Sequence, residues 1–292
     1  MTALFDNHNH SQFSFDVERT SVEATARAAA AAGLAGICFT DHCDFCVPEE
    51  KSENEHFIPE VFDVNARDAE IDRVNAMISR GEIPCRDTDF RQRIPFRVFK
   101  GIEIGVQESA RDRIAERLSD FSFDEVIASL HYLDNSDPYG GRYYVGKDCR
   151  TAYGHYLETL YRELVWLGDR FDIMGHYDYV VRYAPYPECS IRYRDFSDEM
   201  DEILRFLAEN GKALEYNSKT YRELKNRTTV PDRDVYLRFR ELGGEFISLG
   251  SDSHDWRKVG LEFGKAEAFV KSCGFRYLVH FENRQPVMLK IE

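Results

Sequence analysis

The segment Gly36-Ile-Cys-Phe-Thr40 is followed directly by Asp41 and His42, and this pattern predicts the fold. Its apolar, partly β-branched and aromatic side chains are typical of a short buried strand, and the two residues after it can bind a metal ion or a proton. Six other apolar runs lead into polar side chains in the same way, at residues 4–5, 96–102, 126–130, 171–174, 213–216 and 245–249. We therefore predict seven strands with polar side chains after their carboxyl ends.

Longer amphipathic segments separate these strands. Thr20-Ser-Val-Glu23 has the pattern of a capping box at the start of an alanine-rich helix, and Gly33 is a typical helix end. Further helices are predicted at about residues 60–79, 109–118, 152–167, 197–210, 233–242 and 261–272, and an extended segment at 277–281. Regular alternation of strands and helices indicates a parallel sheet covered by helices.

A barrel accounts for the polar residues better than an open sheet does. An open, doubly wound α/β sheet gathers its site at one switch point, whereas a (β/α) barrel builds its site from the loops after all strands. Because polar residues follow all seven strands, we predict an α/β barrel. The 292 residues contain no Pro/Gly/Ser-rich linker and no repeat, so residues 1–292 are expected to form one domain.

Composition excludes several classes of protein. The net charge of −14, from 52 acidic and 38 basic residues, disfavours a nucleic-acid binder, because phosphate backbones demand surplus Lys and Arg. No segment has the long uncharged apolar run of a membrane span, and the N-terminus lacks a secretory pattern. The seven cysteines are scattered, which indicates a reducing cytoplasm. Cys43 and Cys46 have CxxC spacing without a second such pair, so free thiols are expected.

Histidine placement predicts a metal cluster. Six of the nine histidines lie where a predicted strand ends: His8, His10, His42, His131, His176 and His254. One such histidine is ordinarily a satisfied polar residue, but core histidines have no reason to gather at strand ends. Residues i and i+2 of a strand share a face, so His8 and His10 can reach one ion, and Asp252 and His254 have the same spacing. Glu103, Asp16 and Asp252 would supply the carboxylates that bridge ions and offset their repulsion.

These residues fall in ordered motifs that resemble those of the polymerase-and-histidinol-phosphatase (PHP) superfamily, from about residue 6 to residue 260. The motifs are Asn7-His8-Asn9-His10, Thr40-Asp41-His42, Gly101-Ile-Glu103, Ser129-Leu-His131, Gly175-His176 and Ser251-Asp252-Ser253-His254. Within that superfamily the chain is most similar to the monofunctional histidinol-phosphatases. That likeness rests on chain length, the spacing of His8 and Asp16, Glu215-Tyr-Asn217 with Arg222, and Gly175-His176-Tyr-Asp178 with Arg182.

The resemblance implies a distorted, TIM-like (β/α)7 barrel with two or three divalent ions (zinc, iron or manganese) at the carboxyl ends of the strands. By matching position, one ion would be held by His8, His10, Glu103 and Asp252. Glu103 would bridge to a second ion, held by His131 and His176. A third would be held by Asp16, His42 and His254. Asp16 stands where some family members have histidine, which leaves the metal preference of that position open, since imidazole and carboxylate ligands suit all three metals.

The implied activity is hydrolysis of L-histidinol phosphate to L-histidinol and phosphate in histidine biosynthesis. A water between two close cations loses a proton near neutral pH, and the resulting metal-bridging hydroxide attacks phosphorus in line. Three arginines are candidates to bind the phosphate oxygens: Arg182, Arg222 and Arg257. Asp41 or Asp44 would protonate the leaving alkoxide.

The leaving group also has candidate contacts. Residues 132–144, rich in tyrosine, form either a substrate lid or an ordinary packed loop. A charged amine on the substrate would pair with a nearby acid such as Glu215, Asp134 or Asp137.

Other functions remain open at this point. The same site would suit another small phosphate ester or a nucleotide, and a polymerase-linked exonuclease domain is disfavoured by the acidic composition and the lack of fused domains. An amidohydrolase barrel also opens with H-x-H, but it needs a bridging lysine or carboxylate midway, whereas Glu103 comes early and His254 follows the last Asp. A protein that merely stores metal would not need three open, oxygen-rich sites. The expected partner is a small phosphorylated substrate, with no nucleic acid and no membrane.

Overall fold

The computed structural model describes residues 3–17, 19–45, 60–85, 95–134, 136–187, 190–221, 223–224, 227–228 and 231–292. Seven parallel strands neighbour one another in chain order: β1 (Phe5–Asn9), β2 (Gly36–Phe39), β5 (Arg97–Gly105), β6 (Glu125–Ser129), β7 (Ile173–Met174), β8 (Ala213–Asn217) and β11 (Ile247–Gly250). The first and last meet where His10 N donates to Ser253 O, 2.9 Å away. The predicted seven-stranded barrel is confirmed, and it is nearly closed.

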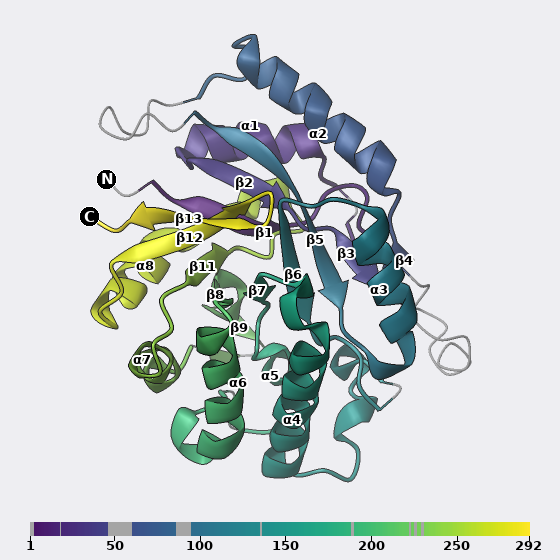
Figure 1. The fold of residues 1–292 in the computed structure, drawn as a ribbon, viewed down its shortest axis with the longest axis vertical. Coiled ribbons are helices and arrows are strands. Elements are labelled where there is room, and N and C mark those ends of the chain that lie inside the picture. The colour runs from purple at the N-terminus through teal and green to yellow at the C-terminus, as the bar shows by residue number, and fades with distance from the viewer. Residues whose placement is uncertain are drawn as a thin grey trace.

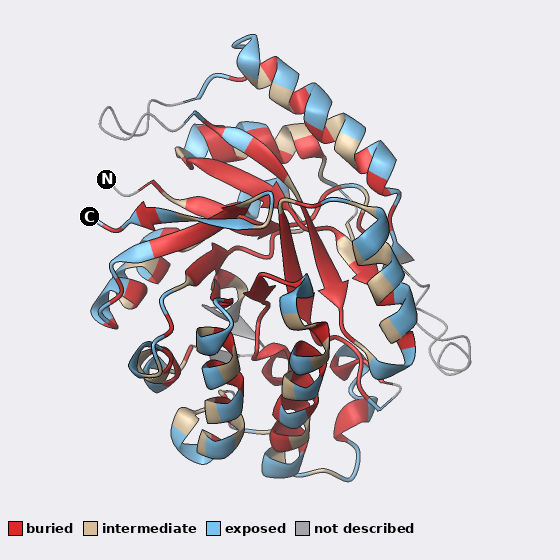
Figure 2. Cartoon of the chain, in the orientation of Figure 1, coloured by how far each residue is buried: buried red, intermediate tan, exposed pale blue. Residues whose placement is uncertain are grey.

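Helices cover the outside of the barrel (Figure 1). They are α1 (Val22–Ala32), α2 (Val64–Ser79), α3 (Arg111–Asp120), α4 (Cys149–Leu167), α6 (Ser197–Glu209), α7 (Arg233–Glu241) and α8 (Phe263–Ser272), with a short α5 (Tyr179–Arg182). The seven barrel strands are almost entirely buried, whereas the long helices carry buried residues on one side and exposed residues on the other (Figure 2). This is the pattern of amphipathic helices packed on a sheet. The short α5 is buried along its whole length. No helix in the described part of the chain is long and apolar enough to span a membrane.

Several predicted helix starts differ from the structure by up to four residues; α4, for example, begins at Cys149 and not at about residue 152. α1 is capped by Ser21, whose Oγ accepts a hydrogen bond from Ala24 N at 3.1 Å, so the capping box predicted from Thr20 does not form. α2 begins after Asp63, which caps it. The residues predicted as its first turn form a strand instead, β4 (Glu60–Val61), antiparallel to β3 (His42–Asp44). Cys46, half of the predicted CxxC pair, lies outside the described residues, and Cys43 is a buried free thiol.

The predicted final extended segment is one arm of a hairpin made of β12 (Tyr277–Glu282) and β13 (Gln285–Lys290). Its two-residue turn, Asn283 and Arg284, has positive φ at both positions (49° and 62°), as such hairpins require. The hairpin lies beside β1 in Figure 1, and the carbonyl of Val279 accepts a hydrogen bond from Asn7 Nδ2 at 3.2 Å. The hairpin therefore adds to the barrel core.

Glu125, at the start of β6, is fully buried, and neither of its carboxylate oxygens has a hydrogen-bond partner among the described residues. Burial raises its pKa well above the ordinary value, and the carboxyl groups of Asp172 and Asp124 add to this. As pH rises above the ordinary glutamate pKa, Glu125 ionises in the unfolded chain but stays protonated in the folded chain. The free energy of unfolding therefore falls by up to about 1.4 kcal/mol per pH unit.

Glu125→Gln removes this loss, so we expect the variant to gain stability over the wild type as pH rises. The difference in unfolding free energy should be small near about pH 5 and largest near about pH 8, as measured by urea unfolding. The control is Glu158→Gln, at an exposed position of α4, which should show the same difference at every pH. A pH-independent difference for Glu125→Gln would contradict the assignment.

Candidate metal centre

Most of the predicted site residues meet in one pocket of about 640 Å³ at the carboxyl ends of the barrel strands. It is lined by eight of them: Asp16, His42, Asp44, His131, His176, Arg182, Asp252 and His254. His8, His10 and Glu103 are fully buried, and their side chains contact those of the lining residues. This is the end of a (β/α) barrel at which active sites are built.

Glu103 of β5 is the centre of the cluster, because five imidazole rings surround its carboxylate. The distances from its oxygens to the nearest ring nitrogens are 2.8 Å for His42, 2.9 Å for His176, 3.3 Å for both His8 and His131, and 3.5 Å for His10. Three rings face one oxygen and two face the other. Such a carboxylate can bridge two ions that are held on either side by imidazoles.

The strand that carries His8 is not regular. Between Asp6 and Asn9, β1 has one residue more than the matching part of β2, which is a β-bulge. Bulges commonly redirect side chains beside active sites. The ring Nε2 atoms of His8 and His10 still both face Glu103 Oε2, so the two histidines approach one point as their spacing predicts.

Several buried polar atoms of this cluster lie close to one another but make no hydrogen bond of good geometry with any described residue. They are His8 Nε2, His10 Nε2, His42 Nδ1 and Glu103 Oε2. Burying a polar atom without a hydrogen-bond partner costs free energy. These imidazole nitrogens and this carboxylate oxygen are ligand atoms that divalent metals prefer, and they point toward one another, so the cluster fits divalent ions. Four groups have ligand atoms close enough to hold one: His10-His42-His254, His8-His10-Asp252, His8-Glu103-His176 and His42-Glu103-His131.

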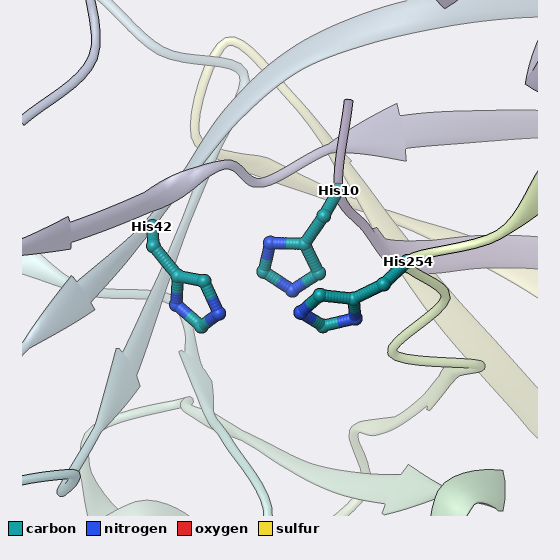
Figure 3. A group of neighbouring side chains, drawn as sticks. All are labelled: His10, His42 and His254. Carbon is teal, nitrogen blue, oxygen red and sulfur yellow. The ribbon is translucent and has the colours of Figure 1, made fainter. Parts of the chain in front are cut away.

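The outer part of the cluster contains His10, His42 and His254, whose rings converge in Figure 3. The ring centroid of His10 lies 4.1 Å from that of His42 and 4.0 Å from that of His254. Asp16 approaches this group from the loop after β1, with its Oδ2 2.7 Å from His254 Nε2 and 3.7 Å from His42 Nε2. The side chain of Asp16 is about one-third exposed, so this side of the cluster opens to solvent.

Asp252 lies beyond the end of β11 in a left-handed backbone conformation, with φ 49°, which is strained for a residue other than glycine. Arg182 Nη1 donates to its Oδ2 at 2.8 Å, and Lys219 Nζ lies 2.6 Å from its Oδ1. Burial would raise the pKa of Asp252, but these two cations outweigh burial and hold it well below its ordinary range. Lys219 lines the pocket and was not predicted, although it follows Asn217 at a strand end.

The electrostatics keep the central carboxylate ionised. Burial raises the pKa of Glu103, but the positive charge of His8, His42 and His131 outweighs burial and lowers it well below the ordinary value. The pKa of His10 is lowered well below its ordinary value by burial and by the neighbouring His254 and His42. Burial lowers the pKa values of His8, His42 and His131, but nearby carboxylates such as Glu103 outweigh burial and raise them above the ordinary value. An ion that binds these rings would therefore displace their protons.

The two residues predicted as the catalytic acid support other side chains. Asp41 is fully buried and accepts hydrogen bonds from Ser11 N (2.6 Å), Ser11 Oγ (2.9 Å) and Ser14 Oγ (3.0 Å). Asp44 lines the pocket, but its Oδ1 lies 3.0 Å from His131 Nδ1. Asp41 does not line the pocket and Asp44 does, so the predicted catalytic acid, which stays a prediction, has only Asp44 beside the pocket.

The predicted arginines differ in position. Arg182 lines the pocket, and its Nε and Nη2 have no partner among the described residues. Arg257 has a mostly exposed side chain that pairs with Asp255 and does not line the pocket, so its phosphate contact stays a prediction. Arg222 lies outside the described residues.

Of the three acids considered for a substrate amine, Asp137 is the one that lines the described pocket. Asp137 lines the pocket and is buried. Asp134 is half exposed and pairs with His155 and Lys147. Glu215 lies behind the cluster, with its Oε1 2.7 Å from His8 Nδ1.

The tyrosine-rich segment 132–144 contributes both to the pocket and to the core. Tyr132, Asp137, Tyr139 and Gly140 line the pocket, whereas Tyr143 and Tyr144 are buried.

A comparison with protein-family models matches residues 6–219 to the PHP domain. The chain belongs to this family. The PHP chain is 34% identical over 278 residues to the histidinol-phosphatase of Lactococcus lactis subsp. lactis (strain IL1403). The aligned region covers 94% of this chain and 93% of that protein. It is 29% identical over 281 residues to a protein of Clostridium acetobutylicum named "Probable histidinol-phosphatase", with coverage of 96% and 98%.

A solved structure resembles the PHP chain as a whole. It is the histidinol phosphate phosphatase of Lactococcus lactis in complex with zinc, L-histidinol and phosphate. The TM-score is 0.81 at 30% identity, over 98% of this chain and 99% of that chain. The predicted family and barrel fold are thus confirmed.

Metal removal tests the cluster directly. We expect dialysis against a chelator to lower the melting temperature, and zinc or manganese to restore it, because an ion at a hundred times its Kd stabilises a fold by about 2.7 kcal/mol. Glu103→Gln should abolish most of this response. Asp134→Asn, outside the pocket, should respond as the wild type does. An equal response of Glu103→Gln and wild type, measured by calorimetry, would exclude Glu103 as a ligand.

Proposed function

We propose that this PHP protein is a metal-dependent phosphomonoesterase that hydrolyses L-histidinol phosphate to L-histidinol and phosphate. The observation that carries the proposal is the carboxylate of Glu103 among five imidazoles, next to a pocket that contains both cationic and acidic side chains. The similarity to a solved histidinol phosphate phosphatase, which binds zinc, L-histidinol and phosphate, supports the choice of substrate.

Divalent cations in this cluster would lower the pKa of water and neutralise phosphate charge. We propose two or three such ions, of zinc, iron or manganese, held by the nine predicted ligands His8, His10, Asp16, His42, Glu103, His131, His176, Asp252 and His254. The four overlapping groups of ligand atoms support more than one ion. We also propose that residues 1–292 form one domain and that the enzyme is cytoplasmic.

The phosphate group would be held by Arg182 and Lys219. Both line the pocket and both contact the ligand Asp252, so their charges lie at the edge of the cluster. Arg182 is buried, and its Nε and Nη2 donors have no partner among the described residues, so they suit two oxygens of one phosphate. These charges would stabilise the negative charge that develops on the non-bridging oxygens.

The leaving alcohol would lie against Asp137 and a wall of tyrosines. Tyr179 O–H donates to Asp137 Oδ1 at 3.0 Å, and the Tyr179 ring lies 5.0 Å from the His131 ring. Tyr183 and Tyr139 continue this wall, with ring centroids 5.1 Å apart. Among the described residues, Tyr179 O–H and the Tyr139 amide donate to this carboxylate, and both donate to Oδ1, so Oδ2 would be available to the substrate. An ammonium group beside an aromatic ring would fit this place.

A screen of phosphate esters with the zinc, manganese and iron forms tests the chemistry. We expect L-histidinol phosphate to be among the best substrates and His131→Ala to lose at least about 100-fold in kcat/KM, since a ligand of the cluster is removed. Hydrolysis of other esters alone would reject the substrate but keep the chemistry. No hydrolysis of any phosphate ester would reject both.

Asp137→Asn tests the leaving-group contact. We expect KM for L-histidinol phosphate to rise by about 10-fold or more, since a charged hydrogen bond is lost. Hydrolysis of p-nitrophenyl phosphate, which has no amine, should not change. Burial raises the pKa of Asp137 to about 6, so the wild type should lose its advantage as pH falls through about 6. Asp134→Asn is the matched control, and an equal loss on both substrates would contradict amine recognition.

A further inference from the structure

Two glycines at strand ends occupy positions where any side chain would collide with a carboxylate. A Cβ on Gly105, at the end of β5, would lie 1.7 Å from Asp44 Oδ1 and 2.5 Å from Asp44 Cγ. A Cβ on Gly250, at the end of β11, would lie 2.1 Å from Glu215 Oε1 and 2.6 Å from His8 Cβ. Neither glycine has a positive φ, so the backbone conformation does not require glycine at these positions. Because they lack a side chain, they leave room for the carboxylates of Asp44 and Glu215.

The carboxylate beside Gly105 contacts a cluster histidine from behind. Asp44 Oδ1 and Oδ2 lie 3.0 Å and 3.3 Å from His131 Nδ1, while His131 Nε2 faces Glu103 at 3.3 Å. A carboxylate on Nδ1 holds the proton there, which leaves the Nε2 lone pair directed toward the cluster. Asp44 therefore fixes both the tautomer and the orientation of this ring.

The carboxylate beside Gly250 supports two parts of the cluster. Its Oε1 lies 2.7 Å from His8 Nδ1, and His8 Nε2 faces Glu103 at 3.3 Å. Its Oε2 accepts from the backbone N–H of His176 at 2.6 Å and from Asn217 Nδ2 at 3.2 Å. Glu215 thereby ties His8 of β1 to the start of the loop that carries His176. It is buried, so solvent does not compete for these hydrogen bonds.

We propose that Asp44 and Glu215 are positioning residues that direct the Nε2 atoms of His131 and His8 toward the metal ions, and that Gly105 and Gly250 serve the metal site by leaving these carboxylates their space. The inference rests on the proposed metal-dependent function. It assigns to two residues without side chains a role in metal affinity.

A double-mutant cycle on Gly105 and Asp44 tests the inference. The three atoms nearest the Cβ of Gly105 all belong to Asp44, so Gly105→Ala should act only by displacing that carboxylate. We expect Gly105→Ala and Asp44→Ala each to weaken zinc affinity by about 10–100-fold, the usual range for such supporting residues. The double variant should bind zinc no more weakly than Asp44→Ala. Competition with a chromophoric chelator gives the affinity without substrate.

The control is Gly264→Ala, in α8, where a Cβ would meet nothing within 4 Å. It should bind zinc as the wild type does. Additive losses in the cycle, or a Gly105→Ala affinity equal to that of the control, would overturn the inference.

Asp44→Asn and Glu215→Gln keep the side-chain volume and remain informative if an alanine variant does not fold. The Asn oxygen can still accept from His131 Nδ1, so Asp44→Asn should retain more zinc affinity than Asp44→Ala. Glu215 accepts hydrogen bonds on both oxygens, and a Gln amide would turn one of them into a donor. Glu215→Gln should therefore lose about 10-fold or more. Equal affinity of Asp44→Asn and Asp44→Ala, or no loss in Glu215→Gln, would contradict the proposed role.

Failure of this inference and failure of the proposed function give different results. If the wild type binds zinc but cleaves no phosphate ester, the function fails while the cycle still reports on positioning. If the wild type is a phosphatase and the losses of zinc affinity in Gly105→Ala and Asp44→Ala add up in the double variant, the positioning role of Asp44 is rejected while the proposed function stands.

Discussion

The barrel mouth depends on one interaction, the contact of the fully buried Glu103 carboxylate with imidazole rings from several strands. An ionised carboxylate cannot be buried alone, because its loss of hydration is too costly unless positive or polar groups replace the water. Here the replacements come from β1, β3 and the loops after β6 and β7. The strands must therefore close around Glu103, and a nearly closed barrel is the arrangement in which distant strand ends face one point.

A second layer of polar residues holds the first one in place. Asp41 illustrates this, because it accepts from Ser14 Oγ, and the same hydroxyl contacts His10 Nδ1 at 3.1 Å and accepts from the His42 backbone N–H at 3.1 Å. Arg67 of α2 lies 3.4 Å from Asp41, which links the outer helix to this network. Asp41, which directly follows a strand, thus supports the positions of His10 and His42 through Ser14.

The sequence predicts the first layer well and the second layer poorly, for a physical reason. Strand ends are local features, marked by apolar runs, so the barrel and the convergence of His8, Glu103 and His254 follow from the order of the runs. The contact of Glu215 with His8 joins residues 207 positions apart, and no local pattern signals it. The final hairpin was missed because its turn, Asn283-Arg284, lacks the glycine that ordinarily marks such turns. Arg257 was predicted from its place after β11, but Asp255, two residues earlier, binds it.

The two sides of the pocket come from different parts of the fold, and this separates chemistry from specificity. The predicted metal ligands lie at or near strand ends, where strand register and barrel closure constrain their positions. The wall of Asp137, Tyr139 and Tyr183 comes from a loop and the end of a short helix, which the sheet does not constrain. Substitutions in that wall change the shape and charge offered to the leaving alcohol without moving Glu103. Under the proposed function, the ions would be held at strand ends while Asp137 and Tyr139 would contact the alcohol from the loop after β6, so a barrel of this kind could retain phosphoester hydrolysis while its preferred alcohol changes.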